Sequence, residues 1–244
     1  MANRRISALP VRRVDGLPEA QNRSGWPWSM TAVRQLLWQG LDPGPITVLV
    51  GENGSGKSTL VEAIAMAYGM SREGGSTGAR HSTRDTESEL WEDLRLVRGA
   101  GASKWGFFLR AETMHGFYSY LEAHPGRAAE PRFHEMSHGE SFLALLESGR
   151  FEDKGLYVLD EPESALSFAG CLALVGVLHK ITANGKAQAI VATHSPIVAS
   201  IPGAHIYELG EWGYRRTPWI ELDLVQNWQS FLGSPNRYLR HVIS

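Results

Sequence analysis

The sequence predicts an α/β domain in which helices flank a mixed, mainly parallel sheet. Three short apolar runs carry this prediction, at residues 46–50, 156–159 and 187–192. None of them alternates regularly between apolar and polar residues, as is typical of parallel strands covered on both faces. The first run is followed by a glycine-rich turn and then by apolar residues with helical spacing, and the second by a helix expected at 166–181.

Composition restricts the class of protein. Of the 244 residues, 43% are hydrophobic and 20% are charged, as in a globular domain rather than a disordered or fibrous chain. Lysine and arginine number 24 against 26 acidic residues, and the net charge of −2 excludes a polybasic protein that coats nucleic acid. This composition is still compatible with a local basic groove on the surface. The single cysteine, Cys171, excludes a disulfide framework and a cysteine-cluster zinc site.

The sequence shows no pattern of secretion or membrane insertion. The first ten residues include two arginines, but no apolar run follows them. The longest apolar stretches, such as 172–178, are far shorter than the roughly 20 residues that cross a bilayer. We therefore expect a cytoplasmic protein without direct membrane insertion.

The segments between the apolar runs fit a single domain over residues 1–244. The arginine-rich stretch 1–45 ends in a strong turn signal. Residues 71–89 contain one apolar side chain and predict a surface loop, which begins an insertion at about 71–135. Within this insertion, a short strand is expected at 105–109.

The C-terminal part, at about 205–244, is expected to form a hairpin and a helix. The hairpin joins 205–209 to 214–219 through a turn that contains two glycines. The helix is indicated by an apolar stripe of Leu224, Trp228, Phe231 and Leu232. An earlier helix, after the insertion, is indicated by Phe142, Leu145 and Leu146.

Residues 51–59 match the phosphate-loop pattern G-x-x-x-x-G-K-[ST] and lie between a predicted buried strand and a helix start. The glycines allow successive backbone N–H groups to point inward, and the helix N-terminus adds positive charge. Lys57 is expected to reach the β- and γ-phosphates, and the Ser58 hydroxyl to bind Mg²⁺. The predicted nucleotide-binding residues of this loop are Gly51, Asn53, Gly54, Ser55, Gly56, Lys57, Ser58 and Thr59.

Two carboxylates follow the second apolar run directly. A buried strand would deliver Asp160 to the carboxyl edge of the sheet, where ligands bind in open α/β folds. There Asp160 can hold Mg²⁺ through water, and Glu161 can take a proton from an attacking water. The alternative is an acidic helix start that complements the helix dipole. The phosphate loop upstream favours the catalytic interpretation.

The third apolar run ends in Thr193-His194 at the same predicted edge. His194 could donate a hydrogen bond to the γ-phosphate, although a histidine at a strand end is usually structural. Before the second apolar run, Ser137 and Glu140 form a capping box, and a capped helix N-terminus beside Gly139 is also an anion site. Local physics does not choose between those two uses of the 137–140 segment.

The order of these segments resembles ATP-binding-cassette (ABC) ATPases: a phosphate loop, a Ser-x-Gly helix start, an apolar run ending in Asp-Glu-Pro, and Thr-His. It is similar in particular to stand-alone cassette ATPases of the AAA-family and SMC/RecF-like groups. The resemblance covers about residues 26–210. Its spacings also fit, because Ser137 lies 23 residues before Asp160 and His194 lies 33 residues after Glu161.

The resemblance implies a P-loop NTPase fold of the ABC type, with an N-terminal antiparallel β lobe and a small helical or loop insertion. It also implies that two copies sandwich two ATP molecules head to tail. Ser137 and Gly139 of one copy would then face the γ-phosphate bound by the other. In that arrangement Glu161 is the general base, His194 is the switch histidine, and residues 164–166 cross the dimer interface.

Some residues depart from the pattern of the family. Residues 137–140 read Ser-His-Gly-Glu where transporters usually carry Ser-Gly-Gly-Gln, and Ser167 stands where an aspartate is common. No glutamine lies between positions 39 and 188, so the usual Q-loop glutamine is missing. Arg110-Ala111-Glu112 occupies its place, and Glu112 is the predicted substitute metal ligand.

Trp26 and Trp28 lie about where ABC ATPases carry an aromatic residue that stacks on adenine. Two tryptophans that flank a proline are at least as often packing residues. The sequence leaves both interpretations open for each of them.

Residues 134–138 also match H-E-x-x-H, the pattern of zinc proteases. That chemistry needs both histidines on one face of a continuous helix. Pro131 precedes the motif closely, and Ser137 and Gly139 interrupt helical continuity behind it. We therefore expect no zinc protease.

The sequence thus supports three hypotheses. The first is a Mg²⁺-dependent ATPase that forms an ATP-dependent homodimer and switches a protein partner or nucleic acid. The second is the ATP-hydrolysing subunit of a membrane transporter, which would need a separate membrane partner. The third is an ATP-gated module, associated with DNA or a nuclease, with little turnover. The near-neutral charge gives direct DNA contact no electrostatic support.

Overall fold

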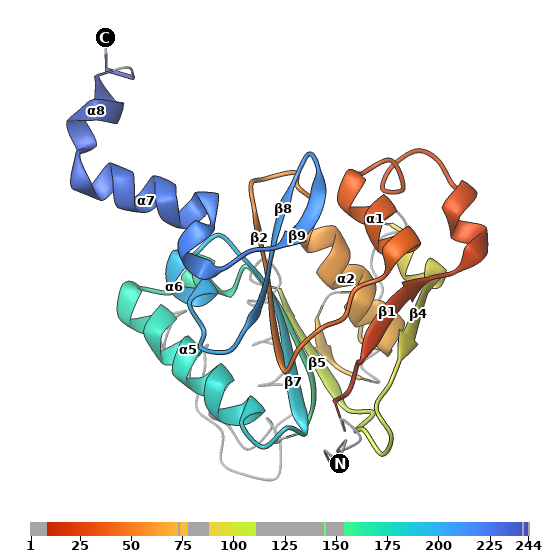
Figure 1. Cartoon of the computed structure of the whole chain (residues 1–244). Helices are drawn as coiled ribbons and strands as arrows, with labels where there is room; N and C mark the ends of the chain where they lie inside the picture. Colours follow the sequence, from red (N-terminus) through yellow and green to blue (C-terminus); the bar gives the residue numbers. More distant parts are fainter. Residues whose placement is uncertain are drawn as a thin grey trace, which may run out of the picture.

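The computed structural model of the chain describes residues 9–72, 74–77, 88–110, 144, 154–240 and 242–243. Within these residues, a main sheet of seven strands has the order β3-β5-β6-β7-β2-β8-β9 (Figure 1). In that order the strands are Gly75–Ser76, Gly106–Arg110, Gly155–Asp160, Ala187–Thr193, Ile46–Gly51, His205–Gly210 and Gly213–Arg216. A second sheet pairs β1 (Arg13–Gly16) with β4 (Leu94–Val97) in antiparallel fashion.

The five inner strands, from β5 to β8, run parallel, and β3 and β9 pair antiparallel at the two edges. Their register aligns the carboxyl ends. Arg110 pairs with Asp160, Asp160 with Ala192, and Val50 with Thr193. The mixed, mainly parallel α/β fold predicted from the sequence is therefore confirmed.

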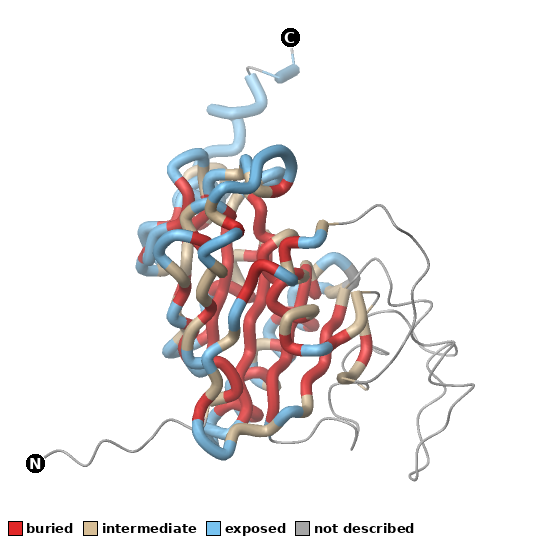
Figure 2. Tube along the Cα trace, turned by 90° about the vertical axis from the view of Figure 1, so that its right-hand side faces the viewer, coloured by how far each residue is buried: buried red, intermediate tan, exposed pale blue. Residues whose placement is uncertain are grey.

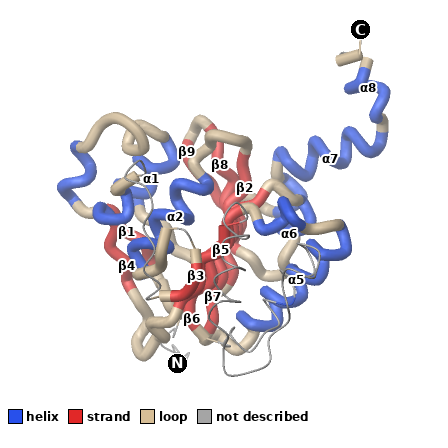
Figure 3. Tube along the Cα trace, turned by 180° about the vertical axis from the view of Figure 1, so that it is seen from behind, coloured by secondary structure: helices blue, strands red, loops and turns tan. Residues whose placement is uncertain are grey.

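Helices cover both faces of this sheet, as the continuous apolar strands require. On one face lie α1 (Thr31–Gln39) and α2 (Lys57–Tyr68), and on the other α5 (Phe168–Thr182), α6 (Pro196–Ala199) and α7 (Asp223–Gly233) (Figures 1 and 3). Strand β2 shows how one sequence serves both layers, because Val48 and Val50 join the α5 side and Leu49 joins the α2 side. The buried segments accordingly gather in the strands at the centre (Figure 2).

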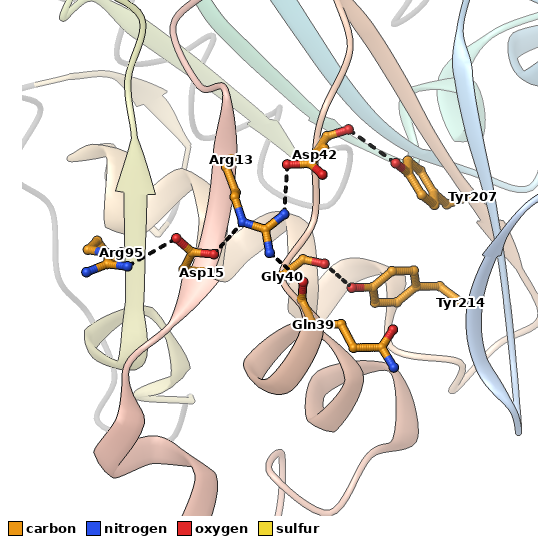
Figure 4. A network of polar contacts seen from close by, with 8 residues as sticks. All are labelled: Arg13, Asp15, Gln39, Gly40, Asp42, Arg95, Tyr207 and Tyr214. Carbon is orange, nitrogen blue, oxygen red and sulfur yellow. Dashed lines mark hydrogen bonds and ion pairs between the residues drawn. The ribbon is translucent and has the colours of Figure 1, made fainter.

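Two polar contacts fix the approach of the chain to β2. The amide of Gln188, fully buried in β7, accepts from Val11 N–H and donates to the carbonyls of Val11 and Gly44. Arg13 of β1 binds Asp15 and Asp42 and donates to a carbonyl of α1 (Figure 4). In the same network, the Tyr207 and Tyr214 hydroxyls of β8 and β9 donate to the backbone at 42 and 40, respectively. The segment that leads into the phosphate loop is thus tied to β7 on one side of β2 and to β8 and β9 on the other.

The structure corrects several predictions about the elements. Residues 75–76, expected in a surface loop, form β3 and pair with Phe107 and Phe108. The predicted hairpin extends the main sheet, because β8 also pairs with β2, and its second strand ends at Arg216, before Pro218. The predicted helix at 166–181 begins at Phe168, where the Ser167 side chain caps it.

The apolar stripe of the C-terminal helix is only partly buried. Leu224 packs against the core, whereas Trp228 and Leu232 are 47% and 69% exposed. Together with α8 (Pro235–Leu239), the outer part of α7 projects from the body of the domain (Figure 1). The predicted helix around 142–146 lies outside the described residues except for Ala144, which is helical, and so does most of the insertion at about 71–135.

Candidate functional site

The phosphate loop connects β2 to α2 and has the backbone of an anion cradle. Gly54 and Gly56 have φ angles of +80° and +98°, in the left-handed region that favours glycine. A Cβ on Gly54 would meet no atom within 4 Å, so this part of the loop faces open space. Gly56 begins α2, and no side chain in the described part of the chain caps it. The N–H groups of the first turn therefore remain available for an anion.

Lys57 lies inside this cradle and is 3% exposed. Its ammonium donates to the carbonyls of Gly51 and Glu52, at 2.8 and 3.0 Å. Burial lowers the pKa of Lys57, and a set of nearby carboxylates opposes that change: Glu161, Asp160, Glu163 and Glu52. The lysine of the loop and the acids that follow β6 thus act on one another across the carboxyl edge of the sheet. A phosphate would give the ammonium a stronger, charged partner than two carbonyls do.

Asp160 ends β6 and is 6% exposed, as expected for a carboxylate delivered by a buried strand. The next residue, Glu161, has φ 49° and ψ 49° and is the one non-glycine residue with a positive φ in the described ranges. This conformation costs roughly 1–2 kcal/mol for a residue with a Cβ. Its N–H donates to the Ala192 carbonyl at 3.0 Å, which anchors the strained residue to the neighbouring strand.

His194 follows β7 and contacts Glu161. The His194 Nε2 atom lies 3.1 Å from Glu161 Oε1, and both side chains are partly exposed. The backbone N–H of His194 donates to Glu163 Oε1 at 2.5 Å. Glu163 lies in the short 3₁₀ helix at 162–165, directly after Glu161. Two carboxylates after β6 therefore hold the imidazole and the backbone of the same histidine.

The donor set fits a hard cation such as Mg²⁺. Ser58 in the first turn of α2 supplies a hydroxyl, and Asp160 supplies a carboxylate. Mg²⁺ commonly takes one or two protein oxygens and completes its shell with substrate phosphates and water. No group of three or more His, Cys, Asp or Glu side chains that could hold a metal is found among the described residues. A site of this kind would thus depend on the nucleotide for its remaining ligands.

Several predicted site residues lie outside the described residues. They are Glu112, the H-E-x-x-H stretch 134–138, Ser137 and Gly139. Of the predicted interface loop 164–166, Ser164 and Ala165 belong to the 3₁₀ turn after Glu161. Sequence reasoning missed two residues at this edge, Arg110 beside Asp160 and Glu163 beside His194. The placement of Arg110 directly after a predicted strand was the available signal for the first.

The structure separates the two candidate aromatic residues. The indole N–H of Trp28 donates to Asp93 at 2.7 Å, and Arg23 lies 5.0 Å above its ring, so Trp28 is a packing residue. Trp26 is 60% exposed. Its turn reaches the phosphate loop through Met30, whose Cε would lie 3.2 Å from a Cβ on Gly56. Of the two tryptophans, Trp26 is therefore the one whose ring is open to solvent.

Comparisons with known proteins agree with this geometry. Residues 39–96, which include β2, the phosphate loop and α2, match a family model described as an AAA domain. A protein of Streptomyces avermitilis described as an ABC transporter ATP-binding protein is 29% identical over 206 residues, which are 80% of this chain and 35% of that protein. The solved structure of a metal-chelate type ABC transporter, in an inward-facing conformation, has 18% identity and a TM-score of 0.50 and covers 92% of this chain and 89% of its own. The chain thus contains a P-loop segment that matches an AAA domain, and its fold is like that of an ABC transporter structure.

The chain is also similar to further ATP-binding proteins of importers. The zinc import ATP-binding protein ZnuC of Paracoccus denitrificans is 28% identical over 166 residues, which are 64% of this chain and 61% of that protein. The chain thus spans between about a third and three fifths of the length of these curated relatives. Within the part that the structure describes, no helix has both the length and the apolar character needed to cross a membrane.

Proposed function

We propose that this chain is an ABC-type ATPase that hydrolyses ATP with Mg²⁺ in a head-to-tail homodimer and uses the cycle to change the conformation of a partner protein. The observation that supports this most is geometric: Lys57 is buried in the phosphate loop after β2, and Glu161 contacts His194 at 3.1 Å at the same carboxyl edge of the sheet. A phosphate cradle and a carboxylate that can activate water therefore share one edge. The whole of 1–244 acts as one ATPase domain in this proposal.

Each residue has a stated role in the proposed reaction. The N–H groups of the loop and Lys57 bind the phosphates, with Gly51, Asn53 and Thr59 completing the loop. Ser58 and Asp160 would hold Mg²⁺, which supplies charge neutralisation at the transferring phosphoryl group when bound. Glu161 accepts the proton of the attacking water, and His194 donates to an oxygen of the γ-phosphate. Water attacks phosphorus, and the bond to the ADP oxygen breaks.

The proposed dimer explains why the site lies at an open edge. In the family that this chain resembles, the signature segment of one copy closes over the nucleotide of the other. Here that segment is Ser137 and Gly139, and Glu112 would take the place of the missing glutamine near the metal. ATP then acts as the contact between two copies, and hydrolysis separates them.

The comparisons favour a transport protein as the partner class. Curated relatives carry the names of ribose, zinc and xylose import ATP-binding proteins. We therefore propose, as the finer function, that the chain is the nucleotide-binding subunit of an ABC transporter. In this proposal, a separate integral membrane protein forms the transport pathway. Stable co-purification of the chain with an integral membrane protein from detergent extracts supports it, whereas purification with soluble proteins alone contradicts it.

The dimer and the chemistry are tested with Glu161→Gln. This variant should hydrolyse ATP at least 100-fold more slowly and should accumulate as a dimer on light scattering in ATP and Mg²⁺, because it binds ATP but lacks the base. The Lys57→Ala/Glu161→Gln double variant is the matched control and should stay monomeric. A monomeric Glu161→Gln variant with normal turnover would refute the proposal.

A further inference from the structure

Arg110 lies between the phosphate-loop helix and the strand that carries Asp160. It is the last residue of β5, and its register partner on β6 is Asp160. Its Nε atom lies 3.7 Å from Asp160 Oδ2, and its Nη1 atom donates to Glu62 Oε2 at 2.7 Å. The Arg110 side chain is 17% exposed. Arg110 therefore joins a carboxylate of α2 to a carboxylate of β6 in a largely buried position.

The position of Glu62 on α2 brings this ion-pair cluster close to the proposed metal site. Glu62 follows Ser58 by four residues, so both side chains lie on one face of the helix. Glu62 also pairs with Arg72 at 3.7 Å. Among the described residues, ion pairs through Glu62 and Arg110 thus link Arg72, Glu62, Arg110 and Asp160 in one cluster.

Arg110 contacts the two carboxylates in different ways. The contact with Glu62 is a short, charge-assisted hydrogen bond, whereas the contact with Asp160 is a longer ion pair. A longer ion pair leaves the Asp160 carboxylate able to turn toward another cation. A divalent ion on Asp160 would lie within a few ångström of the guanidinium, and like charges at that distance repel strongly in a site of low dielectric.

We infer that Arg110 is a positioning residue that competes with the divalent cation for Asp160. In the nucleotide-free protein, the guanidinium holds the carboxylate and keeps the cation out. The triphosphate brings negative charge and further oxygen ligands, which shift Asp160 from Arg110 to the metal. Metal entry is thereby coupled to nucleotide binding. This inference rests on the proposed function, in which Asp160 holds Mg²⁺.

The test measures Mn²⁺ binding to the nucleotide-free protein by electron paramagnetic resonance of the free ion. Arg110→Gln should bind Mn²⁺ at least tenfold more tightly than the wild type, because the competing charge is gone. Arg110→Lys, which keeps the charge, should stay within about threefold of the wild type. Arg72→Gln is the matched control, because it removes the same charge from the far side of Glu62 and should change the affinity less than Arg110→Gln does.

The gain in Arg110→Gln must depend on Asp160, so the further substitution Asp160→Asn should abolish it. Arg110→Met, which keeps an unbranched stem beside Phe108, replaces Arg110→Gln if that variant melts well below the wild type. Equal or weaker Mn²⁺ binding without the Arg110 charge, or a gain that persists in Asp160→Asn, would overturn the inference. Failure of the wild type to bind ATP would instead refute the proposed function, since the Mn²⁺ comparison uses no nucleotide.

Discussion

The imidazole Nε2 of His194 lies 3.1 Å from Oε1 of Glu161, across the carboxyl ends of two adjacent parallel strands. The same histidine is held from its backbone by Glu163. The pair is therefore fixed from both strands, and its geometry does not depend on a long flexible loop. A base and a hydrogen-bond donor in this arrangement can act on one water and one phosphate oxygen.

Replacement of His194 should impair catalysis more than binding. We expect His194→Ala to lower kcat by at least tenfold and to change the KM for ATP by less than threefold, because the phosphate cradle remains intact. Steady-state kinetics at saturating Mg²⁺ give both values. His179→Ala on the exposed end of α5 is the matched control and should behave as the wild type. A kcat equal to that of the wild type in His194→Ala would show that the contact is structural.

The left-handed conformation of Glu161 predicts that glycine stabilises the protein more than alanine at this position. Glu161→Gly should be more stable than Glu161→Ala by about 1 kcal/mol, because glycine has no Cβ penalty at φ 49°. Both variants lose the carboxylate, so the comparison isolates the backbone. Urea unfolding of the two variants measures the difference. Greater stability of the alanine variant would mean that residue 161 is extended in solution.

The two tryptophans should separate nucleotide affinity from stability. Trp26→Ala should weaken ATP binding by about tenfold, since stacking of a base on an aromatic ring contributes about 1–3 kcal/mol, and should leave the melting temperature unchanged. Trp28→Ala should instead lower the melting temperature, because it removes a buried hydrogen bond to Asp93. Titrations with fluorescent ATP measure the affinity, and thermal melts measure the melting temperature. The reverse pattern would assign the stacking role to Trp28.

His205 should make the stability of the domain depend on pH. Burial lowers the pKa of its imidazole, and Arg216 lowers it further. The unfolded chain, with a histidine pKa of about 6.5, then takes up the proton first as the pH falls. The contribution of His205 to the free energy of unfolding is thus fully present above about pH 6.5. It is lost as the pH falls through the folded-state pKa.

The free energy of unfolding of the wild type minus that of His205→Gln isolates this histidine. We expect the difference to be constant between pH 8 and 7 and to decrease as the pH falls from 6.5 to 5. A difference that rises over the acidic range would contradict the assigned direction of the pKa shift.

Parts of the fold could be predicted because their signals are local. Parallel strands that are covered on both faces must be apolar along their whole length, and β2, β6 and β7 were found on that basis within a residue or two of their ends. The phosphate loop has a fixed motif, and its strand and helix flank it directly in the sequence. Strand β3 carries no such pattern, because it is only two residues long. Gly75 and Ser76 form a strand through their pairing with the edge of β5.

The missed site features depend on contacts between distant segments. Arg110 and Glu62 lie 48 residues apart, and no local pattern joins them. Glu161 shows the opposite case, in which a local rule fails. A residue before proline favours an extended backbone, but residue 161 is left-handed, while its N–H donates to the neighbouring strand. Local sterics did not anticipate this conformation.

The most direct test of the account is calorimetric titration of the wild type and Lys57→Ala with a non-hydrolysable ATP analogue and Mg²⁺. We expect the wild type to bind one nucleotide per chain and Lys57→Ala to lose at least 100-fold in affinity. Equal affinity in the two proteins would contradict the assignment of residues 51–58 as the nucleotide cradle.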